Sequence, residues 1–275
     1  MSEAHEGTAT SEIPRGPWQT LILFQRHSAY DSRRVAHFSQ VAPEEKIFGQ
    51  LTPEGRAAAD ARAFARVESI LATTPEKVDF LVVNSPSHWL GLPELGQRAR
   101  ETASRVAYSI LAGLAQRNLS YDHLLNLSGR FKGEETRPDL RIEETRVFDV
   151  LPFANLLREK SGGLGPDFWK NFYDDTYREE REKLGAEGPD DIADRAGAFL
   201  KVTLRFARRY HHDKPDRRLV IWLVSHSEVL ESYLQKRLKL PLEKAKMDYN
   251  DAFSLVVDAT NHVQAIAGDQ TIEVS

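Results

Sequence analysis

Short apolar runs alternate with longer segments of helical periodicity along the chain. Three of these runs have the length and composition of buried strands: Thr20–Gln25, Val78–Ser85 and Leu219–Ser225. The last one, LVIWLVS, is the strongest strand signal in the sequence. Each run ends in a polar residue, and near-continuous apolar runs of this kind predict strands that are covered on both faces of a sheet.

Helical segments separate these strands. Thr52 stands where a helix N-cap is expected and Pro53 suits the first helical position, so a helix should run from Pro53 to about Leu71. Apolar residues then recur at helical spacing in three later segments. Helices are therefore expected to begin near Gln97, at Asp190 or Asp191, and at Glu228.

The order of these elements predicts an α/β protein. Strands alternate with helices, which indicates a three-layer α/β/α sandwich with a mainly parallel sheet. Phe253–Gly268 predicts two strands joined around Thr260–Asn261, which would supply an antiparallel edge strand. Arg146–Phe153 is interpreted as a short third strand or its exit. We expect one domain over residues 17–275, with helical cap insertions at about 118–186, after a disordered polar tail of residues 1–16.

Composition narrows the classes of function. The chain of 275 residues carries 37 Lys and Arg against 41 Asp and Glu, a formal net charge of −4. This balance does not favour a nucleic-acid-binding protein. The sequence contains no cysteine, which excludes disulfides, thiolate metal sites and cysteine nucleophiles. No apolar run approaches the roughly 20 residues of a membrane span, so we expect a cytoplasmic protein with no membrane partner.

Candidate chemistry gathers where the predicted strands end. Arg26 and His27 follow the first strand, and His226 follows the strand Leu219–Ser225. Ligands bind outside the carboxyl ends of strands in sheets of this type, so these residues and Arg98 are expected to converge. A neutral imidazole is a nucleophile toward phosphorus, and arginine forks match phosphoryl oxygens. The set therefore predicts phosphoryl-transfer chemistry at the edge of the sheet.

The same residues lie in motifs that resemble those of the histidine phosphatase superfamily, which includes the cofactor-dependent phosphoglycerate mutases. Arg26-His27 resembles the Arg-His-Gly motif of that family, and LTPEGRAAA resembles the segment that opens its first helix. NSP followed by RARETA is similar to its Ser-Pro and Arg-Ala-x-x-Thr-Ala element, and LVSHS to its second histidine motif. NDAFSLVVD resembles its closing edge strands. The resemblance spans about residues 20–268 in the order of the family.

The resemblance implies a phosphoglycerate mutase-like fold and a set of roles. His27 would be the phosphorylated nucleophile, and Arg26, Arg98 and His226 would hold the phosphoryl group. Asp149 lies where many members carry the proton donor, with Glu143 and Glu159 as rival acids. Neither a metal nor a cofactor is expected, and the substrate would be a phosphomonoester of a small molecule or a protein.

Several positions depart from the family pattern. Ser28 and Ser227 stand where many members have glycine, and the Ser28 hydroxyl is a candidate hydrogen-bond donor to phosphate. Arg33 lies where mutases tend to have a phosphate-contacting asparagine, so it is a candidate cation for the same group. Arg98 fits the arginine motif better than Arg100, and a shift of register would exchange the two.

Three functions are compatible with these observations. The leading hypothesis is a metal-independent phosphatase that hydrolyses a phosphomonoester through a phosphohistidine on His27. A phosphoglycerate-type mutase is the alternative within the same fold. A module that binds a phosphorylated ligand or partner without turnover is the alternative outside enzymes. The two serines in place of glycines argue against the mutase.

Overall fold

The computed structural model describes residues 18–30, 50–72, 75–86, 97–128 and 134–274. Its core is a seven-stranded sheet with the order β3-β2-β4-β1-β5-β6-β7. The strands are β1 (Thr20–Arg26), β2 (Val78–Asn84), β3 (Arg137–Pro138), β4 (Arg218–Ser225), β5 (Ala252–Val257), β6 (Val263–Ala267) and β7 (Gln270–Glu273). The first four are parallel to one another, whereas β5, β6 and β7 continue the sheet in antiparallel order.

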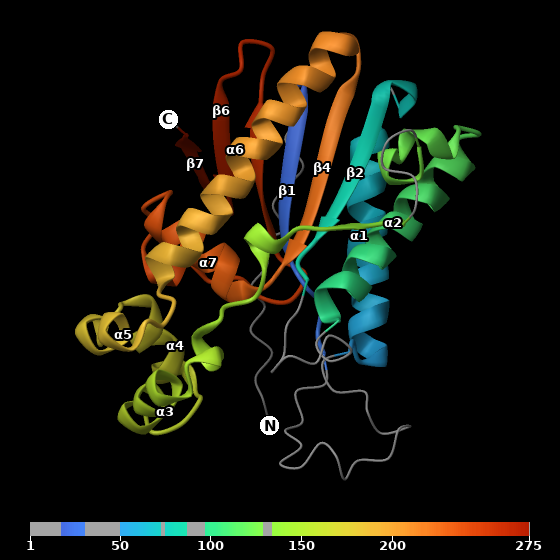
Figure 1. Ribbon diagram of the computed structural model, residues 1–275. Coiled ribbons are helices and arrows are strands. Elements are labelled where there is room, and N and C mark those ends of the chain that lie inside the picture. Colours follow the sequence, from blue (N-terminus) through green and yellow to red (C-terminus); the bar gives the residue numbers. More distant parts are fainter. Residues whose placement is uncertain (1–17, 31–49, 73–74, 87–96, 129–133, 275) are drawn as a thin grey trace.

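Helices cover both faces of this sheet, which confirms the predicted α/β/α sandwich (Figure 1). On one face α1 (Pro53–Leu71) and α2 (Arg98–Gln116) pack through small and branched side chains against the sheet. On the other face lie α6 (Pro189–Asp213), α7 (Ser227–Lys236) and the short α8 (Leu242–Ala245). Burial of both faces explains why the central strands are almost entirely apolar.

The predicted N-terminus of the first helix is confirmed in atomic detail. The Thr52 hydroxyl accepts a hydrogen bond from the Gly55 N–H at 3.0 Å, and Pro53 is the first helical residue. The closing hairpin is also confirmed, because β5 and β6 pair and Asn261 has the left-handed backbone, φ 64°, of their connection. The sheet then extends beyond the prediction, since β7 adds a third antiparallel strand.

The segment between β3 and α6 forms three helices, as a helical insertion predicts. These are α3 (Leu151–Lys160), α4 (Pro166–Tyr173) and α5 (Arg178–Leu184), which lie together below α6 and α7 in Figure 1. The prediction of a strand at 146–153 is wrong: Val147–Asp149 is a 3₁₀ turn, and α3 begins at Leu151. Phe148 packs on Phe168 of the cap at 5.8 Å between ring centroids, so its apolar character reflects helix packing rather than a strand.

Two other expectations are not tested by the described residues. The tail of residues 1–16 lies outside them, and the division into a single domain stays a prediction. Among the helices that the structure describes, none combines the length and the apolar character that crossing a membrane requires.

Candidate active site

Two histidines meet at the carboxyl ends of the two central strands. Arg26 ends β1 and pairs with Ser225, which ends β4, so His27 and His226 leave the sheet side by side. Their ring centroids lie 5.1 Å apart, and both side chains are buried. The neighbouring positions of β1 and β4 are visible in Figure 1. The parallel register of the sheet thus produces the pair predicted from the strand ends.

His27 has the hydrogen bonds of a neutral imidazole with a fixed tautomer. Its Nδ1 lies 2.8 Å from the Ser28 carbonyl, an acceptor, so Nδ1 carries the proton. The Arg98 Nε–H donates to His27 Nε2 at 3.0 Å, which requires a lone pair on Nε2. Burial, followed by the charges of Arg98 and Arg26, holds the pKa of His27 well below its ordinary value, against the hydrogen bond to Ser28. The ring therefore presents an unprotonated nitrogen to the arginine.

Arg98 connects the histidine to an acid. It is the first residue of α2, its side chain is buried, and its guanidinium forms an ion pair with Glu144. Tyr30 stacks on the same guanidinium, with the ring centroid 4.5 Å from the Arg98 Cζ. Arg100 instead has an exposed side chain that pairs with Glu134 at 3.5 Å. The structure thus brings Arg98, and not Arg100, to the histidines.

His226 is the N-cap residue of α7 and is fully buried. Burial, and then the charge of Arg98, hold the pKa of His226 well below its ordinary value. Two carboxylates face it: the possible ligand atoms of Glu144, His226 and Glu228 all lie within 4.8 Å of one another. Both histidines are therefore neutral at physiological pH, and each has an acidic or guanidinium neighbour.

Arg26 completes the group of cations near His27. Its Nη1 donates to the Met247 carbonyl at 2.5 Å, and its guanidinium lies over the Tyr249 ring at 4.3 Å. Tyr249 and Tyr30 in turn lie 5.8 Å and 5.3 Å from the His27 ring, centroid to centroid. Sequence reasoning missed both tyrosines. Their rings lie against the guanidinium groups of Arg26 and Arg98 and limit the rotation of these arginines.

Ser28 has a different position from the one that a phosphate donor would need. Its hydroxyl donates to the Gly55 carbonyl at 2.6 Å and accepts from the Asn250 side chain at 2.8 Å. Its backbone N–H donates to the Thr102 hydroxyl at 3.1 Å. Both polar groups of Ser28 are thus used inside the protein, which favours a positioning role for it over the predicted phosphate contact.

The acids are distributed differently from the prediction. Asp149 is exposed in its 3₁₀ turn, and the described contacts of His27, Arg98 and His226 do not include it. Glu159 is exposed on α3, and buried Glu143 accepts from Arg146 at 2.6 Å. The structure places Glu144 and Glu228 beside the histidines instead. Adjacent glutamates in the LRIEE segment and the acid two residues after His226 are the sequence signals for them. Arg33 lies outside the described residues.

The two glutamates and His226 have the donor types of a divalent-cation site. However, the Arg98 guanidinium already forms an ion pair with Glu144. Its positive charge would repel a metal ion bound by Glu144, Glu228 and His226. The pairing of Glu144 with Arg98 therefore argues against a metal ion at this position.

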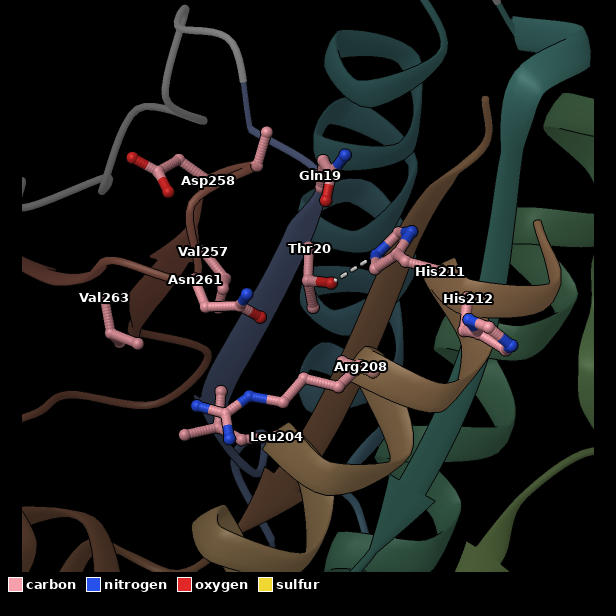
Figure 2. Close-up of a pocket in the computed structure, with 12 residues that line it drawn as sticks. Gln19, Thr20, Leu204, Arg208, His211, His212, Val257, Asp258, Asn261 and Val263 are labelled. Carbon is pink, nitrogen blue, oxygen red and sulfur yellow. Dashed lines mark hydrogen bonds between the residues drawn. The ribbon is translucent and has the colours of Figure 1, made fainter. Parts of the chain in front are cut away.

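A cavity of about 360 Å³ lies at the opposite end of β1. Figure 2 shows residues that line it. It is bounded by Thr20 at the start of β1, by the last turns of α6 and by the hairpin around Asn261. The Thr20 hydroxyl and His211 Nε2 are hydrogen-bonded at 2.7 Å on its wall. Thr20 and His27 are seven residues apart along β1 and its exit, a span of about 23 Å. The cavity is thus distinct from the site at the strand ends.

Among the comparisons with known proteins, only the comparison with solved structures finds proteins similar to this chain. No protein-family model and no curated protein matches the chain. The native structure of a mycobacterial glucosyl-3-phosphoglycerate phosphatase is 17% identical, with 93% of this chain and 99% of that chain covered and a TM-score of 0.45. A phosphoglycerate mutase from Bacillus anthracis is 14% identical, with 93% and 92% covered and a TM-score of 0.46. YhfR from Bacillus stearothermophilus is 16% identical, with 91% and 98% covered and a TM-score of 0.46. These proteins are what the chain is similar to, and its chemistry has to be inferred from its own side chains.

Proposed function

We propose that the protein is a phosphomonoester hydrolase of the histidine phosphatase type, with His27 as the nucleophile. The observation that carries the proposal is the state of the His27 ring. Its Nδ1 proton is held by the Ser28 carbonyl, and its unprotonated Nε2 points at the Arg98 guanidinium. An anion attracted to that guanidinium would lie directly in front of the nucleophilic nitrogen.

The reaction has two steps. In the first, a bond forms between His27 Nε2 and phosphorus while the bond from phosphorus to the leaving oxygen breaks, and an acid gives that oxygen a proton. In the second, water attacks the phosphohistidine and returns a proton to the same acid. Arg26, Arg98 and His226 are proposed to hold the phosphoryl oxygens, and neither step uses a metal ion.

We assign the proton to Glu144. In the free protein its carboxylate is neutralised by Arg98. A phosphoryl group that takes up Arg98 removes this partner and places an anion nearby, and both changes favour the protonated acid. Binding of the substrate thus prepares the acid for the leaving group. Asp149, the acid predicted from the sequence, is instead exposed.

The central test is hydrolysis of p-nitrophenyl phosphate by the wild type and by His27→Ala. We expect the variant to lose activity by at least 10³-fold and the wild type to form an acid-labile phosphohistidine. His212→Ala, an exposed histidine on α6, is the matched control and should keep full activity. Undiminished hydrolysis by His27→Ala would refute the proposal. Transfer of the phosphoryl group to phosphoglycerate rather than water would indicate a mutase, and vanadate binding without turnover would indicate a binding module.

The acid is tested with two leaving groups. Glu144→Gln should lower kcat for an alkyl phosphate by about 10² or more, but far less for p-nitrophenyl phosphate, whose leaving group needs little protonation. Asp149→Asn should leave both rates unchanged. The opposite pattern would return the donor role to Asp149. Activity that persists after prolonged treatment with a chelator is expected from a mechanism without metal.

A further inference from the structure

We propose that Glu228 sets the affinity of the site for phosphate, because its buried carboxylate opposes the arginines and speeds the release of the dianionic product. This inference rests on the proposed function and adds a specificity-determining residue to it. Nothing in the reaction itself requires an acid at this position.

Glu228 is held firmly in the site. It is the second residue of α7 and is 5% exposed. The Ser227 hydroxyl donates to its Oε2 at 3.2 Å, and its carboxylate lies within 4.8 Å of donor atoms of Glu144 and His226. In the part of the chain that the structure describes, no lysine or arginine nitrogen lies within 4.0 Å of this carboxylate. The negative charge is therefore available to act on whatever enters the site.

The described charges balance before any ligand binds. Arg26 and Arg98 contribute two positive charges, and Glu144 and Glu228 contribute two negative ones, while His27 and His226 are neutral. A phosphate dianion would thus enter a site with no net positive charge in these groups. With Glu228 neutral, the same site would have a net charge of one positive unit. The second carboxylate therefore weakens the attraction of the site for a dianion.

This effect has a use in a hydrolase. Groups that bind substrate and product equally tightly do not raise the turnover rate. Tight binding of the product, inorganic phosphate, slows its release and so delays the next catalytic cycle. A fixed negative charge weakens the binding of the free dianion more than that of the phosphoryl group on His27. The ring gains a positive charge when Nε2 bonds to phosphorus and Nδ1 keeps its proton, and this charge offsets part of the negative charge of the phosphoryl group. Glu228 would thus limit product inhibition while the arginines still stabilise the transfer.

A structural role is the competing explanation, since an acid in the first turn of a helix stabilises that helix. The two explanations predict different results for Glu228→Gln. Glutamine preserves the size of the side chain and its acceptor for the Ser227 hydroxyl, but removes the charge. A structural role predicts lower stability and unchanged or weaker phosphate binding, whereas our proposal predicts tighter binding.

The experiment measures the Kd of inorganic phosphate and of vanadate by calorimetry at pH 7.5, and the Ki of phosphate against p-nitrophenyl phosphate. We expect Glu228→Gln to lower each of these three constants by at least about 10-fold to 100-fold, the range for a pair of unit charges at about 6–8 Å in a partly buried site, with the larger effect on a dianion. Glu228→Asp keeps the charge and should stay near the wild type. Glu243→Gln, an exposed acid on α8, should have no effect.

Unchanged or weaker phosphate binding by a folded Glu228→Gln would overturn the proposal. Thermal unfolding establishes whether the variant is folded, and Glu228→Ser, which removes the same charge and suits a first helical turn, replaces it if it is not. Failure of the proposed function gives a separate result: the wild type then neither turns over phosphomonoesters nor binds phosphate. Turnover in the wild type with no gain of affinity in the variant rejects the role of Glu228 alone.

Discussion

Glu231 lies between the cap and Arg26. Replacing it with glutamine should make the free energy of unfolding fall less as the pH rises. Glu231 lies on α7 with 7% of its surface exposed. Its carboxylate accepts from the Met247 N–H at 3.1 Å, and the Tyr173 hydroxyl of α4 also donates to it. Burial raises the pKa of Glu231 to about 7, although both hydrogen bonds and the charge of Arg26 act in the opposite direction.

The sign and size of the effect follow from linkage. The ordinary pKa is 4.5 and the folded value is about 7, so between these pH values the folded protein holds a proton that the unfolded chain has lost. The free energy of unfolding contributed by this group is therefore fully present below pH 4.5 and is lost as the pH rises through 7. The interval corresponds to about 3 kcal/mol.

Urea denaturation at pH 5 and pH 8 tests this value. We expect the free energy of unfolding of the wild type to fall between these pH values by about 2–3 kcal/mol more than that of Glu231→Gln. Titrations elsewhere in the protein are common to both chains and cancel in the comparison. Glu243→Gln, whose carboxyl is exposed, should follow the wild type. An equal pH dependence of the wild type and Glu231→Gln would refute the linkage between burial and protonation.

Three further substitutions test the packing of the helices and of the sheet. Gly55→Ala should lower the free energy of unfolding by at least about 2 kcal/mol, because a Cβ there would lie 2.1 Å from the Ala29 carbonyl oxygen. Gly197→Ala, with nothing within 4 Å in helix α6, should raise it by about 0.5–1 kcal/mol, and equal effects in urea denaturation would contradict this contrast. Gln25→Leu should lower the free energy of unfolding by about 1–3 kcal/mol, because the Trp222 Nε1–H would lose the acceptor that lies 2.9 Å away. A neutral result in the same assay would show that the indole is satisfied in another way.

The sequence predicts the central strands and the helices on both faces of the sheet because local pattern and tertiary environment agree there. Thr52 and Pro53 specify the start of α1, and the apolar run of β4 has no helical alternative of suitable length. At Arg146–Phe153 the local pattern is ambiguous, since a few apolar residues suit a buried strand as well as a helix that packs on a cap. Pro152 in the first turn of α3 is the one local signal that favours the helix.

The histidines of the site were predictable, whereas the position of Glu144 was not. His27 and His226 follow strands whose parallel pairing fixes where they meet. Glu144 depends on the path of an irregular segment between β3 and α3, and no periodicity in the sequence determines that path. The position of an acid on such a segment becomes clear only from the charged group that it contacts in the folded protein. For Glu144 this group is Arg98, more than 40 residues earlier in the chain.

The serine after His27 shows how the fold orients the proposed nucleophile. Glycine at this position would leave the strand exit without side-chain contacts, whereas the Ser28 hydroxyl connects the first turn of α1, through Gly55, to Asn250 before β5. The absence of a side chain on Gly55 lets α1 approach the exit of β1 closely enough for this hydrogen bond. The fixed Ser28 carbonyl then holds the Nδ1 proton of His27, so that Nε2 must face Arg98. The Ser28 hydroxyl thus helps to fix the position of the backbone carbonyl that sets the tautomer of His27, on which the proposed reaction depends.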